Sequence, residues 1–154
     1  MRNIRDNYSI MFDDGLGGAS EILPKLWLGS FNDPVIDFLH ANGIATVLNV
    51  SEHTSEEVAE LSPNVRYIHI PLEFEWQYHK SRMDEALRAV HALREAHKTA
   101  AVLIHCAGGV DRSPCVVYKY MKDLGIKDPY RIIKARRPIV FPHADWWEPA
   151  TLKY

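Results

Sequence analysis

The chain has 154 residues, with 18 lysines and arginines against 20 aspartates and glutamates and a formal net charge of −2. This balance provides no general basic field for nucleic acid or for an anionic membrane surface, and no apolar run is long enough to span a bilayer, so neither is an expected partner. The length suits one domain with an ordinary core, which we expect to be a monomer.

The chain opens with a predicted arm. Residues 1–20 end in the glycine-rich stretch "DDGLGGAS", whose glycines favour a flexible connection, so the folded domain is expected to cover residues 21–154. The next stretch, "EILPKLWLGS" (21–30), predicts a short strand pair, or a strand and a turn, that ends at Gly29.

Helical and strand patterns alternate along the rest of the chain. Apolar residues recur at helical spacing in the predicted helices, whereas the predicted strands are short apolar or β-branched runs. The alternation predicts an α/β fold with a mainly parallel central sheet of about four to five strands, flanked by helices on both sides. Helices are predicted at 32–43, 54–61, 81–97, 113–125, 128–136 and 142–154, strands at 44–50, 65–70 and 100–104, and an aromatic-rich loop at 71–80.

Several helix ends carry recognisable capping residues. Asn32 or Asp33 can cap the first predicted helix, and Gly43 can end it, because glycine adopts the left-handed backbone that often follows a last turn. Asp128 can cap the helix at 128–136, with Pro129 in its first turn.

The numbers and spacings of the cysteines and histidines indicate the cellular compartment and whether the chain binds a metal ion. The two cysteines make no disulfide framework, and the N-terminus shows no secretory segment, so we expect a reducing, cytoplasmic environment. The eight histidines show neither Cys-x2-Cys nor His-x3-His spacing, so we expect no metal site.

The stretch "LIHCAGGVDRSP" (103–114) joins a predicted strand to a predicted helix through a glycine-rich turn. Open α/β sheets bind ligands outside the carboxyl ends of their strands, and a helix N-terminus offers unpaired N–H groups and partial positive charge. Gly108 and Gly109 permit the close turn that an anion nest needs, and the planar fork of Arg112 can bind two phosphate oxygens at once. The turn is therefore a predicted phosphate site.

Cys106 lies at the mouth of this turn. The same N–H groups and Arg112 favour its thiolate, since cysteines in such surroundings have pKa values of about 3.5 to 7.5. A thiolate that faces a bound phosphate is an activated nucleophile for covalent phosphoryl transfer, with Ser113 as a hydrogen-bond donor to the sulfur. His105 is expected to face inward and orient the turn. The alternative is an inert, buried cysteine in a glycine turn.

The pattern His105-Cys106-(five residues)-Arg112-Ser113 resembles the signature loop of the cysteine-dependent protein tyrosine phosphatases. Two further stretches, "ILPKLWLGS" and "PHADWW", resemble the dual-specificity branch of that superfamily. The resemblance implies a dual-specificity phosphatase-like fold, a catalytic domain at 21–154, a phosphocysteine at Cys106, a phosphoprotein substrate, and no metal or cofactor. It also implies phosphate binding by the loop, through Ala107, Gly108, Gly109, Val110 and Arg112.

At the position of the family's general acid, this sequence differs from the family pattern. In the resembled branch it is an aspartate on the loop after the third strand, and here Phe74 stands at that place. Nearby candidates are Glu73, Glu75 and His79. A histidine, His143, stands about where the branch has an asparagine that supports the active-site loop.

Asp111 offers another proton donor, because it precedes Arg112 inside the loop. Myotubularins resemble this chain in that feature, and there the loop aspartate is thought to be the acid. We therefore hypothesise that Asp111 is the general acid. Two alternatives stay open: a turn residue that bonds its own backbone, or a charge that tunes the pocket.

The sequence predicts the type of reaction more narrowly than it predicts the substrate. A deep cleft would admit phosphotyrosine alone and a shallow one phosphoserine and phosphothreonine too, with Trp76 and Tyr78 able to stack on a phenyl ring. A phosphoinositide phosphatase is an alternative, although no lysine lies within 107–111 to bind extra phosphates. A phosphate-binding module without turnover is another.

Two features outside the loop have two interpretations each. Cys115 either packs in the core or forms a protective disulfide with an oxidised Cys106. A basic cluster around the end of a predicted helix is expected to be a solvated face, with attraction of acidic substrates as the alternative. It consists of Arg131, Lys134, Arg136 and Arg137.

Overall fold

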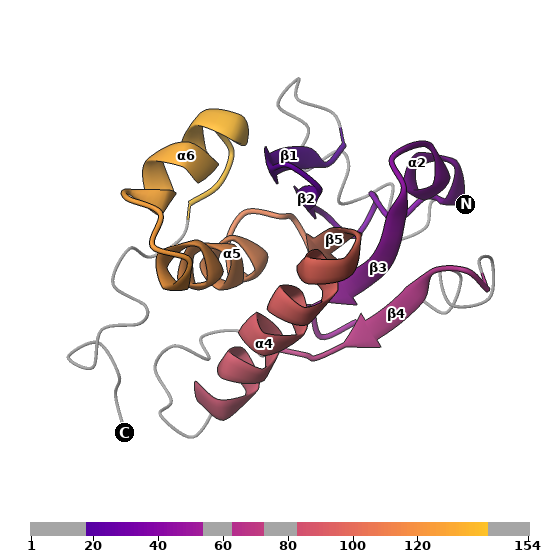
Figure 1. Ribbon diagram of the computed structural model, residues 1–154, viewed down its shortest axis with the longest axis horizontal. Coiled ribbons are helices and arrows are strands. Elements are labelled where there is room, and N and C mark those ends of the chain that lie inside the picture. Colours follow the sequence, from indigo (N-terminus) through magenta and orange to yellow (C-terminus); the bar gives the residue numbers. More distant parts are fainter. Residues whose placement is uncertain (1–17, 54–62, 73–82, 142–154) are drawn as a thin grey trace.

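The computed structural model describes residues 18–53, 63–72 and 83–141 (Figure 1). The predicted helices at 54–61 and 142–154, and almost all of the predicted arm, lie outside these ranges. The described elements alternate between strand and helix much as the sequence predicts. They are β1 (Ser20–Leu23), β2 (Leu26–Gly29), α2 (Ile36–Ala41), β3 (Ile44–Asn49), β4 (Arg66–His69), α4 (Met83–Thr99), β5 (Ala101–His105), α5 (Arg112–Asp123) and α6 (Pro129–Arg136).

Five strands form one sheet in the order β1-β2-β5-β3-β4. The β1–β2 pair is antiparallel, and every other pair in this sheet is parallel. The prediction of an α/β fold with a mainly parallel sheet is confirmed, and "EILPKLWLGS" forms a strand pair. Strand β5 lies at the centre and is buried along its whole length, as expected for a parallel strand covered on both faces.

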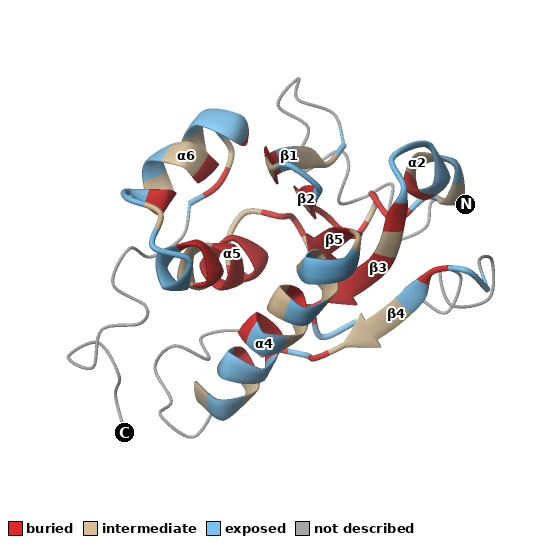
Figure 2. Ribbon diagram, viewed as in Figure 1, coloured by how far each residue is buried: buried red, intermediate tan, exposed pale blue. Residues whose placement is uncertain are grey.

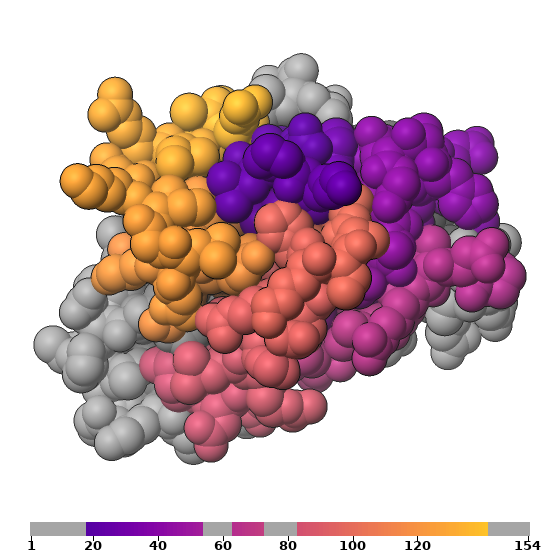
Figure 3. All heavy atoms as spheres, viewed as in Figure 1, coloured from indigo at the N-terminus to yellow at the C-terminus, as the bar shows by residue number. Residues whose placement is uncertain are grey.

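The two faces of the sheet bury separate apolar clusters. Val102 and Ile104 of β5 pack in the larger cluster with α4, α5 and α6. Ala101 and Leu103, which point the other way because strand side chains alternate, pack with Leu39 of α2. Figure 2 shows the burial of the central strands and α5, with the exposed faces of α4 and α6 turned outward. In Figure 3, β1 and β2 lie between the atoms of α6 and those of α2.

The predicted cap of α2 is wrong. The helix begins at Ile36, Val35 occupies the N-cap position, and no side-chain cap is seen there among the described residues. The carboxylate of Asp33 instead accepts hydrogen bonds from the backbone N–H and the hydroxyl of Ser30, at 2.6 and 3.1 Å. This local pairing turns the carboxylate back toward β2 and away from the helix.

Other element ends agree with the sequence to within one or two residues. Gly43 has a φ of +62° just after α2, which is the left-handed conformation expected at that end. Asp128 occupies the N-cap position of α6 and Pro129 follows it, but the Asp128 side chain caps nothing in the described helix. Within the described ranges, no helix is both long and apolar enough to cross a membrane.

Candidate active site

The loop from Cys106 to Asp111 leaves the carboxyl end of the central strand β5 and leads into α5. Its carbonyl groups are held by the backbone of neighbouring segments. Phe31 N–H donates to the carbonyl of Ala107 at 2.9 Å, and Phe141 N–H donates to that of Val110 at 2.8 Å. The scaffold on either side of the loop therefore fixes its path.

Cys106 lies at the base of this loop and is 2% exposed. Burial raises the pKa of the thiol, but the charge of Arg112, the hydroxyl of Ser113 and the backbone N–H groups of Ser113 and Gly109 outweigh it. The net pKa of Cys106 is lower than that of an ordinary cysteine, in the direction that the sequence predicts. The Ser113 hydroxyl donates to the sulfur at 3.2 Å.

Arg112 begins α5 and is 9% exposed. Its Nη1 donates to the backbone carbonyl of Leu72 at 3.0 Å and to Oε1 of Glu52 at 3.3 Å. The guanidinium is thus held between the segments that follow β3 and β4. Glu52 is not among the residues predicted from the sequence; the available signal was a carboxylate just after the carboxyl end of a buried parallel strand.

His105 is fully buried and faces inward, as predicted. Its Nδ1 lies 3.1 Å from the carbonyl oxygen of Cys106, and its ring packs edge-on against Phe31 with the centroids 5.9 Å apart. The side chain therefore braces the start of the loop.

Gly109 is the glycine that the loop geometry requires. Its φ is +67°, and a Cβ there would lie 2.5 Å from the carbonyl oxygen of Gly29 and 2.7 Å from Nη2 of Arg137. In the described loop Gly108, in contrast, has no positive φ. Only the second glycine of the pair thus adopts the unusual backbone conformation that the sequence analysis allowed for both.

Asp111 occupies the N-cap position of α5 with φ of −125° and ψ of −74°. It is half-buried, and its side chain makes no cap hydrogen bond with the described helix.

The predicted solvated basic cluster is wrong for one of its four members. Arg137 is 2% exposed, and its guanidinium donates to the carbonyl of Gly109 at 3.0 Å. Arg131 and Arg136 are exposed, and Lys134 donates to the carbonyl of Val140 at 2.8 Å. The sequence placed Arg137 with its neighbours because nothing in its local pattern distinguishes it from them.

A family model described as the dual specificity phosphatase catalytic domain matches residues 26–150. The chain belongs to this family. It is 36% identical over 132 residues to human dual specificity protein phosphatase 5, and the match covers 82% of this chain and 33% of that protein. The chain therefore spans about a third of the length of this curated relative.

Solved structures agree with the family. The crystal structure of DUSP15 is similar with a TM-score of 0.66 and 27% identity, covering 87% of this chain and 85% of that one. The crystal structure of human DUSP28 is similar with a TM-score of 0.69 and 22% identity, covering 84% of this chain and 87% of that one. At this identity, the similarity supports the fold alone. The resemblance to the dual-specificity branch is thus confirmed.

Several predicted site residues of this dual specificity phosphatase domain lie outside the described residues. They are the alternative acids Glu73, Glu75 and His79, the cleft aromatics Trp76 and Tyr78, and the supporting His143. Cys115 is described: it is buried in the larger core cluster, and both cysteines are free thiols. Among residues 18–53, 63–72 and 83–141, no group of three or more histidine, cysteine, aspartate or glutamate side chains is arranged to hold a metal ion.

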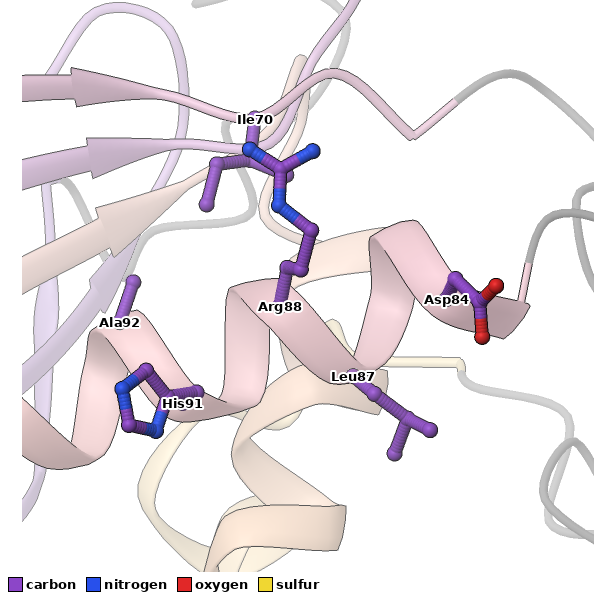
Figure 4. Close-up of a pocket in the computed structure, with 6 residues that line it drawn as sticks. All are labelled: Ile70, Asp84, Leu87, Arg88, His91 and Ala92. Atoms are coloured by element: carbon purple, nitrogen blue, oxygen red, sulfur yellow. The ribbon is translucent and has the colours of Figure 1, made fainter.

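A separate cavity of about 540 Å³ lies between the end of β4 and helix α4. In Figure 4, Arg88 extends from α4 toward Ile70, with Leu87 and His91 along the same helix. The described residues that line this cavity include none from the Cys106 loop. It is lined by Ile70, Asp84, Leu87, Arg88, His91 and Ala92.

Proposed function

We propose that this domain is a protein phosphatase that hydrolyses phosphotyrosine, and phosphoserine and phosphothreonine where the cleft admits them, through a phosphocysteine at Cys106. The observation that carries the proposal is the arrangement around the sulfur. A cysteine with a lowered pKa lies at the base of a loop that opens a helix, with Ser113 3.2 Å from its sulfur and Arg112 contributing charge. Membership of the dual specificity phosphatase family supports the same chemistry.

The reaction proceeds in two phosphoryl transfers. Arg112 and the loop amides of residues 107–110 bind the phosphate oxygens, and the Cys106 thiolate attacks phosphorus. An S–P bond forms as the bond to the leaving oxygen breaks, and an acid protonates that oxygen. Water then attacks phosphorus and gives its proton to the acid residue that the first step left deprotonated. The S–P bond breaks, inorganic phosphate is released, and the Ser113 hydroxyl stabilises the departing thiolate.

Asp111 is the proton donor in this proposal, with Glu73, Glu75 and His79 as the alternatives. Its support is its position at the N-cap of α5, immediately before Arg112. His143 is proposed to support the active-site loop. In the same proposal the domain covers residues 21–154, acts as a cytoplasmic monomer on phosphoproteins, and uses neither nucleic acid nor membrane as a partner.

Phosphate release from a panel of substrates tests the function. The panel contains a phosphotyrosine peptide, phosphoserine and phosphothreonine peptides, and a series of phosphoinositides. We expect release from the phosphotyrosine peptide above all phosphoinositides. Faster release from phosphoinositides would favour a lipid head-group phosphatase, and tight phosphopeptide binding without release would favour a binding module.

The lowered pKa of Cys106 predicts the pH dependence of its alkylation. Because the thiolate is the reactive form, inactivation by iodoacetamide is expected to stay fast as the pH falls below the ordinary cysteine pKa, and to slow only below the lowered one. Ser113→Ala removes a donor to the thiolate, so the midpoint is expected at higher pH. The rate of inactivation measured against pH checks both, and an unchanged midpoint in Ser113→Ala would show that the hydroxyl does not stabilise the thiolate.

The ion pair between Glu52 and Arg112 predicts competition with phosphate. The Glu52 side chain is 47% exposed, and such pairs contribute about 0.2–1 kcal/mol. Glu52→Gln is therefore expected to tighten the binding of inorganic phosphate by about 1.4- to fivefold, because the variant removes the negative charge beside the guanidinium. Competitive inhibition by phosphate measures this, and weaker inhibition in the variant would mean instead that Glu52 orients Arg112.

A further inference from the structure

We infer that Arg137 is a positioning residue that holds the phosphate-binding loop from behind and ties it to the segment entering β1. The inference rests on the proposed function, because the orientation of the loop matters to activity only if the loop binds phosphate. It assigns a role to a side chain that follows α6 and lies 25 positions after Arg112 in the sequence.

The guanidinium of Arg137 bridges two parts of the molecule. On one side its Nε donates to the carbonyl of Gly109 at 3.0 Å, and its Nη2 donates to that of Gly108 at 3.4 Å. On the other side its Nη1 donates to the carbonyl of Gly18 at 2.9 Å and to the hydroxyl of Ser20 at 3.1 Å. Figure 3 shows α6 beside β1, which is the arrangement that brings these groups together.

The contact with Gly108 fixes the direction of a particular peptide group. A trans peptide points its N–H opposite to its C=O, and no cis peptide occurs in the described ranges. The peptide whose carbonyl faces Arg137 is the one whose N–H, on Gly109, stabilises the Cys106 thiolate. Arg137 therefore holds that donor toward the sulfur by binding the opposite end of the same peptide.

The bond to the Gly109 carbonyl acts in the same way on the next peptide, whose N–H belongs to Val110. A positive charge at a carbonyl oxygen also polarises the peptide and strengthens its N–H as a donor. Two successive loop amides are thus oriented and polarised by one buried cation, on the side of the loop opposite the anion.

The surroundings leave little room for any substitute. A Cβ on Gly109 would lie 2.7 Å from Nη2 of Arg137, so the loop backbone and the guanidinium are in close contact. Asp33, which is 9% exposed, also interacts electrostatically with Arg137; burial raises the pKa of its carboxyl, and the charge of Arg137 opposes that rise. A cation that is buried with its hydrogen bonds satisfied in this way is strongly constrained in position, and removing it leaves several polar partners unsatisfied.

Arg137→Met is the direct test, with Arg136→Met as the matched control. Both variants lose one positive charge at adjacent positions, but Arg136 is exposed. We expect Arg137→Met to weaken inhibition by inorganic phosphate by about tenfold or more, and to move the midpoint of Cys106 alkylation to higher pH. Arg136→Met is expected to match wild type in both measurements.

Arg137→Lys keeps the test decisive if the methionine variant does not fold. Lysine retains the charge but not the planar fork, so an intermediate loss of phosphate affinity and an intermediate alkylation midpoint are expected. A folded Arg137→Lys or Arg137→Met with a wild-type midpoint and wild-type phosphate inhibition would overturn the inference. Failure of the proposed function looks different, since wild type itself would then release phosphate faster from phosphoinositides than from the phosphotyrosine peptide, or from no substrate at all.

Discussion

Cys106→Ser is expected to abolish the turnover of a phosphotyrosine peptide while leaving its binding intact. The sulfur is the atom that forms the bond to phosphorus, and a serine hydroxyl lacks the accessible anion that the loop stabilises at this position. Loss of a nucleophile that acts together with its neighbours removes most of the catalysis, so the rate is expected to fall by more than about 10⁴-fold. Arg112 and the loop amides are unchanged, so the variant should still bind the peptide.

Cys115→Ser serves as the control for this substitution. Cys115 is buried in the core cluster within α5, so its replacement is expected to lower stability modestly and to leave turnover near that of wild type. Phosphate release measures turnover, and fluorescence anisotropy of a labelled phosphopeptide measures binding. Turnover that survives in Cys106→Ser, or that is lost to the same extent in Cys115→Ser, would exclude Cys106 as the nucleophile.

Asp111→Asn is expected to slow the hydrolysis of phosphotyrosine by about 10²–10⁴-fold, which is the usual contribution of a positioned general acid. The reason is specific to the leaving group: a phenoxide leaves poorly without a proton, whereas a nitrophenolate leaves well without one. The same variant is therefore expected to lose little activity on nitrophenyl phosphate. The ratio of the two rates, in wild type and variant, is the measurement.

Glu75→Gln and Glu73→Gln are the matched controls for Asp111→Asn, since each also replaces a carboxylate by its amide. Both are expected to retain the acidic limb of the pH–rate profile. If Asp111→Asn keeps the wild-type rate on phosphotyrosine and one of the controls loses it, the proton comes from the 73–79 segment and Asp111 only shapes the turn.

The loop was predictable from sequence because its determinants are local. An apolar strand, a glycine turn and a helix start follow one another within "LIHCAGGVDRSP", and β5, the loop and α5 appear where that order places them. The mainly parallel sheet was predictable for a similar reason, since strand and helix patterns alternate along the chain.

The parts of the site that sequence reasoning missed are held by long-range contacts. Glu52 reaches Arg112 across 60 positions, and Arg137 reaches Gly109 across 28. The only local signal for Glu52 is its place just after a buried strand, and no neighbour distinguishes Arg137 from the predicted solvated cluster. The predicted cap of α2 is wrong because of a local contact. Asp33 is a residue type that caps helices, but Ser30, three positions away, binds its carboxylate.

Trapping the phosphoenzyme tests the central claim, covalent transfer of phosphate to Cys106, most directly. Wild type and Cys106→Ser are mixed with a phosphotyrosine peptide, quenched rapidly in denaturant and digested for mass spectrometry. A peptide carrying one added phosphoryl group on Cys106, absent from Cys106→Ser, is the predicted result. Phosphate released at the wild-type rate with no such peptide at any quench time would contradict the account.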